Sequence, residues 1–136
     1  MTLHDLNAHL DMVTQLHAAR ETLQNVQGRV LGAQRLDGMP HAHNASRGVE
    51  SLSILLATLS AEVDRLERIV KRSEDSGIRA WIEAIPDIRI MTIFNLRFLC
   101  GLEWSDVAAF VGGRNTEEAV KAACYRYLND EDSPQF

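Results

Sequence analysis

The sequence predicts an all-α protein in which a long helical hairpin or coiled-coil arm precedes a trihelical helix-turn-helix domain. Apolar residues make up 46% of the chain and aromatic residues 6%, a composition that favours helix over sheet. Apolar residues also recur at steps of three and four, and glycine and proline punctuate these segments. We therefore expect an arm over 1–76 with a loop at 32–47, a helix-turn-helix domain over 77–129 and an acidic tail over 130–136.

The first long helix is predicted over residues 2–31. One apolar stripe runs along it, formed by Leu3, Leu6, Leu10, Val13, Leu16, Ala19, Leu23, Val26 and Val30. This spacing is that of one face of a helix. The run GAQRLDGMPHAHNASRG, which begins at Gly32, is rich in glycine and small polar residues. It predicts a connector that ends the helix.

The second long helix is predicted from about Arg47 to Ser73, with a tighter heptad pattern. One core position holds Val49, Leu56, Val63 and Val70, and the other holds Leu52, Leu59 and Leu66. Such a pattern favours a two-stranded coiled coil, although Ile54 and Leu55 widen the stripe toward a bundle. Because neither helix can bury its stripe alone, we expect an antiparallel hairpin, a dimer or both. A homo-oligomer formed through the arm is the corresponding partner prediction.

Shorter helices follow the arm. The pattern breaks over 73–77, and a short helix is expected around 78–85, with Trp81 as a core anchor. Pro86 and Asp87 are suited to the start of the next helix, which runs to Cys100 and is the most apolar segment of the chain. That helix is predicted to be the core helix. Cys100 and Cys124 lie in predicted helices without CxxC spacing and are expected to be reduced, packed thiols.

The segment from about Leu96 to Leu128 predicts the helix-turn-helix itself. Gly101 ends the core helix, and a short helix begins near 103–105 with Val107, Ala108 and Val111 as its inner face. Gly112 provides the turn between crossed helices. Thr116 is suited to cap a last helix over 116–128, in which the inner candidates are Ala119, Val120, Ala123, Tyr127 and Leu128.

The stretch from Trp81 to Leu128 resembles the region-four helix-turn-helix of bacterial sigma factors, especially in small phage-encoded regulators of the RinA and ArpU type. The matching residues are Ile85-Pro86-Asp87, Leu96-Arg97-Phe98, Gly101-Leu102-Glu103-Trp104, Val107-Ala108, Gly112, Val120 and Tyr125-Arg126-Tyr127-Leu128. Gly38-Met39-Pro40, between the long helices, extends a weaker similarity to most of the chain. The resemblance implies a phage or prophage protein that acts in transcription.

The predicted DNA site lies in the turn and in the helix 116–128, which would enter the major groove. Arg114 and Arg126 are expected to contact phosphates. Lys121 and Tyr125, with Asn115 or Thr116 at the helix start, are expected to reach base edges or backbone. Five basic and five acidic residues fall between Asp87 and Leu128, so the module is formally neutral. Weak binding by one module follows, and dimerisation would bring a second module to the DNA.

Two other functions remain open. A neutral trihelical unit also suits a protein-interaction module, whose partner would be RNA polymerase or another phage protein. A small-terminase-like DNA-packaging subunit likewise joins a helix-turn-helix to a coiled coil. Ring-sized oligomers would favour the packaging subunit, and dimers the regulator.

Several classes of function are not expected. The sequence has no glycine-rich phosphate loop and no nucleophile with an evident base, so neither an enzyme nor a cofactor is predicted. His41 and His43 have no third ligand at a characteristic spacing, and no metal site is predicted. His4, His9 and His17 are expected at surface or stripe positions. With no membrane-spanning run and no secretion signal, a cytoplasmic location is expected. The net charge of -5 removes the overall attraction that most DNA-binding domains use.

Overall fold

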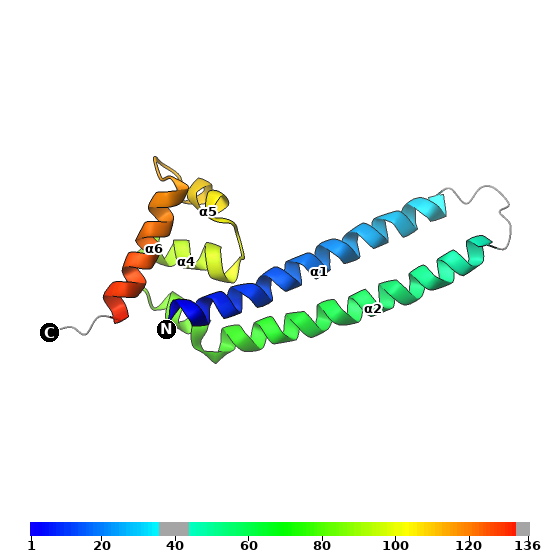
Figure 1. The fold of residues 1–136 in the computed structure, drawn as a ribbon, viewed down its shortest axis with the longest axis horizontal. Helices are drawn as coiled ribbons and strands as arrows, with labels where there is room; N and C mark the ends of the chain where they lie inside the picture. Colours follow the sequence, from blue (N-terminus) through cyan, green and yellow to red (C-terminus); the bar gives the residue numbers. More distant parts are fainter. Residues whose placement is uncertain (36–43, 133–136) are drawn as a thin grey trace. The chain divides into compact units, whose positions relative to one another are not determined.

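A computed structural model describes the backbone of residues 1–35 and 44–132 and the side chains of residues 1–31 and 48–130. The regular elements in these ranges are all helices, and no strand occurs among them (Figure 1). The all-α prediction is therefore confirmed. In the part of the chain so described, no helix is long and apolar enough to cross a membrane.

The chain divides into two compact units, one formed by Met1–Thr14 with Ile69–Phe136 and the other by Gln15–Arg68. These units do not coincide with the predicted domains, because the first 14 residues belong with the C-terminal helices. The cause is packing: Leu6 and Leu10 are buried in the same apolar cluster as Ile78 and Phe98. An apolar stripe indicates that a helix face is buried but not which helix covers it.

The unit Gln15–Arg68 contains most of α1 (Leu3–Arg35) and α2 (Asn44–Ser73), which run in opposite directions (Figure 1). Both long helices were predicted, but the predicted connector over 32–47 was too long. Residues 32–35 still belong to α1 and residues 44–47 already belong to α2. Within the unit, Leu16, Val63 and Leu66 are buried. An exposed ion pair joins Arg20 Nη2 of α1 to Glu67 Oε1 of α2 at 2.8 Å.

The break predicted over 73–77 is a change of helix type. A π-helical turn, η1 (Glu74–Ile78), follows α2 directly and leads into α3 (Arg79–Glu83). Gly77 within this turn has φ 132°, a backbone conformation that side chains other than glycine rarely adopt. The predicted short helix over 78–85 corresponds to the end of η1 and α3.

The predicted core helix is α4 (Ile88–Phe94) continued by the π-helical turn η2 (Asn95–Leu99). The side chain of Asp87 caps it and accepts hydrogen bonds from the backbone amides of Arg89 and Ile90. After η2 the chain turns at Gly101, where φ is 73°. The predicted start at Pro86-Asp87 and end at Gly101 are thus confirmed.

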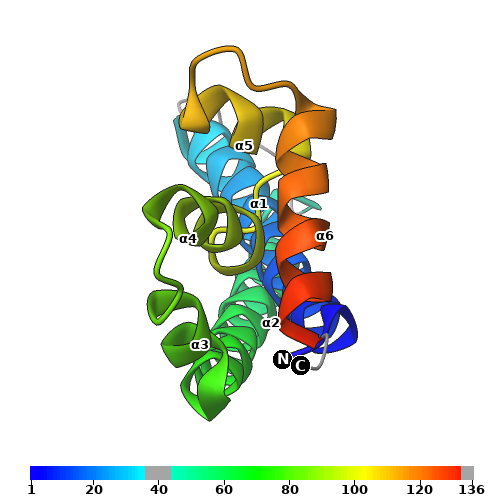
Figure 2. The same cartoon turned by 90° about the vertical axis from the view of Figure 1, so that its left-hand side faces the viewer.

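The last two helices are α5 (Trp104–Val111) and α6 (Glu117–Asp132). Gly112 and Gly113 both have positive φ in the turn between them, and the Thr116 hydroxyl accepts a 3.1 Å hydrogen bond from the Ala119 amide. The predicted turn and cap are therefore present. Figure 2 shows α4, α5 and α6 grouped together, with the turn at one end of α6. Helix α6 also includes residues 130–132, which were assigned to the tail.

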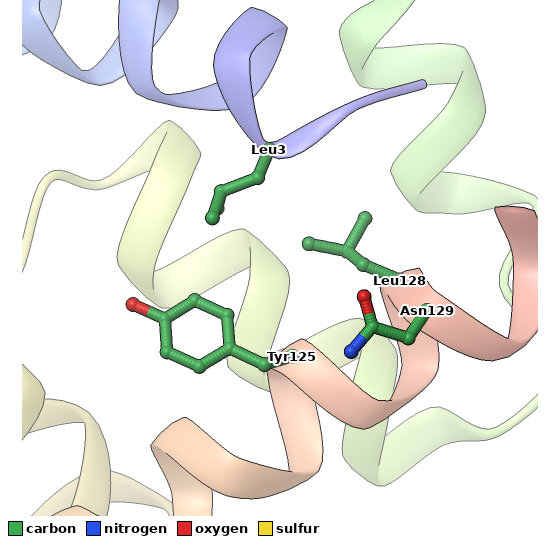
Figure 3. A pocket seen from close by; sticks show the side chains of 4 residues that line it. All are labelled: Leu3, Tyr125, Leu128 and Asn129. Carbon is green, nitrogen blue, oxygen red and sulfur yellow. The ribbon is translucent and has the colours of Figure 1, made fainter.

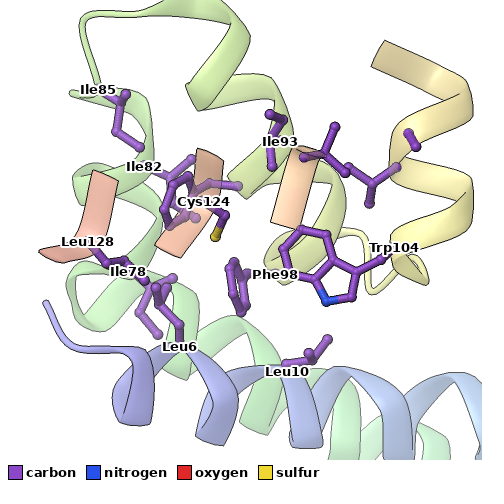
Figure 4. Close-up of a cluster of buried hydrophobic side chains, with 14 residues drawn as sticks. Leu6, Leu10, Ile78, Ile82, Ile85, Ile93, Phe98, Trp104, Cys124 and Leu128 are labelled. Atoms are coloured by element: carbon purple, nitrogen blue, oxygen red, sulfur yellow. The ribbon is translucent and has the colours of Figure 1, made fainter. Parts of the chain in front are cut away.

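One apolar cluster holds the first and last parts of the chain together, and Leu6 and Leu10 enter it from α1 (Figure 4). Its buried members are Leu6, Leu10, Ile78, Ile82, Ile85, Ile93, Phe94, Phe98, Trp104, Val107, Ala108, Val120, Cys124 and Leu128. Trp81 and Tyr127 pack against the cluster while half-buried. The prediction that Ala119 faces inward was wrong, since Ala119 is exposed about 100° around α6 from the buried Val120.

The two cysteines differ in their surroundings. Cys124 is buried in α6, and this burial raises the pKa of its thiol to about 12. Cys100 is exposed, contrary to the prediction of a packed thiol, and its Sγ lies 3.6 Å from Asn95 Oδ1. Cys100 is the residue that follows η2 at the end of the core helix, and it is not part of the apolar cluster.

Among the described side chains of the unit formed by Met1–Thr14 with Ile69–Phe136, His9 is the buried polar one. Its Nδ1 lies 2.7 Å from Ser73 Oγ, and its Nε2, which lies 3.8 Å from Glu74 Oε1, has no hydrogen-bond partner. The other carboxylate oxygen of Glu74 accepts a 2.6 Å hydrogen bond from Arg79. Burial outweighs the attraction of Glu74 and lowers the pKa of His9 below its ordinary value. A hollow of about 370 Å³ beside the ring is also lined by Asp5.

The stability of the protein is expected to fall on acidification below about pH 6.5, with His9 as one cause. Its folded-state pKa is lowered from 6.5, so the unfolded chain takes up a proton where the folded chain does not. This contribution is present above the unfolded pKa and is lost below it by at most about 1.4 kcal/mol per pH unit. Urea unfolding at neutral and acidic pH measures it. His9→Gln should show a weaker pH dependence and the exposed control His4→Gln should not; equal curves for all three proteins would contradict the assignment.

Candidate functional site

The predicted DNA-contacting residues lie in two places, the turn before α6 and one side of that helix. Arg114 and Thr116 are exposed around the turn, and Asn115 between them is half-buried. Along α6, Arg126 is exposed, Tyr125 is 37% exposed and Lys121 is half-buried. The structure therefore brings Arg114 and Thr116 together at the exposed start of α6.

Asn115 holds the turn in place. Its Nδ2 donates a 2.7 Å hydrogen bond to the carbonyl of Gly112, and its Oδ1 accepts a 2.5 Å hydrogen bond from Arg89 of α4. Both ends of the amide are thus used within the protein. Asn115 positions the turn rather than offering a free side chain to a ligand. Arg89, which sequence reasoning missed, takes part because the fold brings two segments 26 residues apart into contact.

A second set of contacts positions the middle of α6. The guanidinium of Arg97 lies 4.9 Å from the ring centre of Trp104 and donates a 2.8 Å hydrogen bond to the carbonyl of Leu102. Trp104 in turn packs edge-on against Tyr125, with ring centroids 6.2 Å apart. Tyr125 therefore has one side against the protein, and it also lines a hollow of about 250 Å³ with Leu3, Leu128 and Asn129 (Figure 3).

The spacing of residues along α6 separates the predicted contacts into two groups. Lys121 and Tyr125 are four residues apart and share one side of the helix. Arg126 lies about 100° further around the helix from Tyr125, on the side opposite the buried Val120 and Cys124. Arg126 and the pair Lys121–Tyr125 therefore flank the exposed face of α6 rather than forming one cluster.

The electrostatics of α6 are mixed. Glu117 and Glu118 are exposed in its first turn, where they stabilise the positive end of the helix dipole. Lys121 and Arg126 are its two basic side chains. If α6 entered a groove of DNA, Glu117 and Glu118 would also lie near the phosphates. Their negative charge would oppose the attraction of Arg114, Lys121 and Arg126. This arrangement agrees with weak electrostatic attraction by a single module.

A hollow of about 450 Å³ lies beside the turn, lined by Ile88, Arg89, Thr92, Phe110, Val111, Gly112, Gly113 and Asn115. Ile88 and Phe110 are 75% and 71% exposed, the highest values among large apolar residues in the described part of the chain. This pair of exposed residues was not singled out from the sequence. Phe110 was, however, left out of the predicted inner face of α5, which agrees with its exposure. Ile88 and Phe110 thus place two exposed apolar side chains at one hollow beside the turn.

Among the described side chains, no group of three or more His, Cys, Asp or Glu residues is placed to hold a metal ion. His41 and His43 lie outside the described residues, as does Gly38-Met39-Pro40.

Comparison with known proteins gives no relative. No protein-family model matches the chain, and no curated protein or solved structure is significantly similar to it.

Proposed function

We propose that the protein is a DNA-binding transcription regulator of phage or prophage type, in which α5 and α6 act as a helix-turn-helix. The observation that carries this proposal is the order of a short helix, a turn with two positive-φ glycines and a capped helix of 16 residues. At about 1.5 Å per residue, α6 is about 24 Å long, enough to lie along a major groove. The sigma-region-four resemblance in the sequence supports the same function.

The contacts in this proposal follow from exposure. Arg114 and Arg126 are exposed and bind phosphates, while Lys121 and Tyr125 approach base edges or backbone from one side of α6. The Thr116 hydroxyl accepts the capping hydrogen bond and can still donate one to a phosphate oxygen. Asn115 contributes indirectly through its hydrogen bonds to Arg89 and Gly112. Because few cations face the DNA, two copies act together as a dimer.

Lys121→Ala is expected to weaken DNA binding about tenfold, since a good side-chain contact to a base or phosphate is worth roughly one factor of ten. The measurement is a titration at low salt with DNA that flanks the protein's own gene. Arg126→Ala should also reduce the salt dependence of binding, because one phosphate contact is lost per module. The control is Arg65→Ala, which removes the same charge from a residue paired with Glu62 on α2. Absence of binding by folded wild-type protein at low salt would overturn the proposal.

A protein-interaction module is the second candidate function. The exposed pair Ile88 and Phe110 beside the turn favours it, because DNA phosphates offer no partner for large apolar side chains. RNA polymerase or another phage protein would be the partner in this case. The exposed glutamates at the start of α6 would then meet a basic surface. Failure of DNA binding together with loss of a partner on Phe110→Ala would favour this function. A ring-sized oligomer would instead favour the DNA-packaging subunit.

A further inference from the structure

Within the unit Gln15–Arg68, we define the outer part of the arm as residues 21–31 of α1 and 48–61 of α2, and the inner part as residues 15–20 and 62–68. The apolar side chains of the outer part are less buried than those of the inner part. Leu16, Val63 and Leu66 are 5% to 6% exposed in the inner part. In the outer part the stripe residues Leu23, Val26, Val30, Leu52, Leu56 and Leu59 are each half-buried, and Val49, predicted at a core position, is 49% exposed. A pair of helices therefore covers the apolar stripe in the inner part but not in the outer part.

On α2, two large apolar side chains of the outer arm lie outside the two core positions of the heptad. Ile54 is 65% exposed and Leu55 is 41% exposed. In the heptad of α2, Leu55 flanks the positions that face α1, and Ile54 lies on the side of the helix opposite them. Helix α1 therefore leaves both side chains exposed. Burial of apolar side chains of this size is stabilising, and the isolated chain does not gain that stabilisation fully here. The surface is suited to another helix that packs against this side of α2.

The charge pattern indicates what kind of partner fits. Residues 21–31 and 48–61 contain three charged side chains, those of Glu21, Arg29 and Glu50. The next seven residues, 62–68, contain five. The outer arm thus presents serine, threonine, alanine and glutamine around its apolar residues. A partner with a strongly charged face would find no complementary charges, whereas an identical surface would match it without repulsion.

We propose that a second copy of the chain packs on the outer arm through Ile54 and Leu55, and that the two arms form a four-helix bundle. The contact is isologous, so the same two residues are buried on both copies. This deepens the dimer of the proposed function by specifying its interface. It does not depend on DNA binding, and its test uses no DNA.

The test is light scattering of the full chain at roughly 50 µM, together with circular dichroism, because association at that concentration requires only micromolar affinity. Wild type is expected to have twice the chain mass. Ile54→Glu should raise the dimer dissociation constant about a hundredfold or more, since two copies lose a buried side chain and gain an unpaired charge. Ile54→Ala should raise it about tenfold. Because Ile54 is 65% exposed within one chain, helix content should not change.

The matched control is Ser53→Glu, which adds the same charge at the neighbouring exposed position, about 100° around the helix. A dimeric wild type and control with a monomeric, helical Ile54→Glu would support the interface. A monomeric wild type, a dimer insensitive to Ile54→Glu or a ring of many copies would overturn it. None of these results bears on whether α6 binds DNA, so failure of this inference is distinguishable from failure of the proposed function.

Discussion

Replacing Phe94 by alanine is expected to lower the free energy of unfolding by about 3–5 kcal/mol, because a large buried side chain is removed and a cavity is left. Phe94 is 0% exposed. Its ring centroid lies 5.3 Å from that of Trp81 and 5.7 Å from those of Phe98 and Tyr127. These rings come from α3, η2 and α6, so the substitution affects the packing of three elements on α4.

Urea unfolding followed by circular dichroism measures this effect, and Phe110→Ala provides the matched control. The chemical change is identical, but Phe110 is 71% exposed, so its loss should change the free energy of unfolding by less than about 0.5 kcal/mol. Similar effects of the two substitutions would mean that Phe110 is buried in solution, for example in an oligomer, or that Phe94 is not part of the core.

Local chemistry explains why most elements could be predicted from the sequence. Gly101 and Gly112 end helices where φ is positive, and Thr116 caps the helix that follows it. Each of these signals acts over a few residues, which is why the helix order from α4 to α6 was predictable. The connector between the long helices was predicted too long, since Gly32 did not end α1. One glycine costs a helix only about 1 kcal/mol.

Contacts between distant segments were not predictable in the same way. The apolar stripe of α1 predicted that Leu6 is buried. A long helix was expected to cover the whole stripe, whereas the first turns of α1 pack against the C-terminal helices. His9 lies on the stripe and is accepted there because Ser73, 64 residues later, provides a hydrogen bond. A stripe carries no information about its partner, so the division of the chain into units had to come from the structure.

The candidate site shows the same limit. The positions of Arg114, Thr116 and Arg126 follow from helix periodicity and the cap, and their exposure agrees with the sequence pattern. The internal roles of Asn115 and Tyr125 do not, because they depend on Arg89 and Trp104. A polar or aromatic residue on a helix can face a ligand or a neighbouring helix, and periodicity alone does not distinguish these cases.

Ile54→Glu is also expected to weaken DNA binding about a hundredfold. This prediction combines the proposed helix-turn-helix function with the proposed arm interface. Two linked modules bind with an affinity about 10² to 10⁴ times that of one module, and the substitution would remove this gain. The substitution lies in the arm unit, Gln15–Arg68, and leaves every proposed DNA contact unchanged. The expected loss therefore comes from separating two modules and not from changing either one. DNA titrations at fixed low salt, on fragments with one and with two half-sites, measure it.

The one-site fragment carries the decisive comparison. Ile54→Glu and wild type should bind it with similar affinity, because only one module can engage, while Lys121→Ala should be weaker than both. On the two-site fragment Ser53→Glu should match wild type, since it adds the same charge without touching the interface. A monomeric Ile54→Glu that binds the two-site fragment as tightly as wild type would show that a single module is sufficient. In that case three exposed or half-buried cations, Arg114, Lys121 and Arg126, would have to provide the affinity without help from the arm.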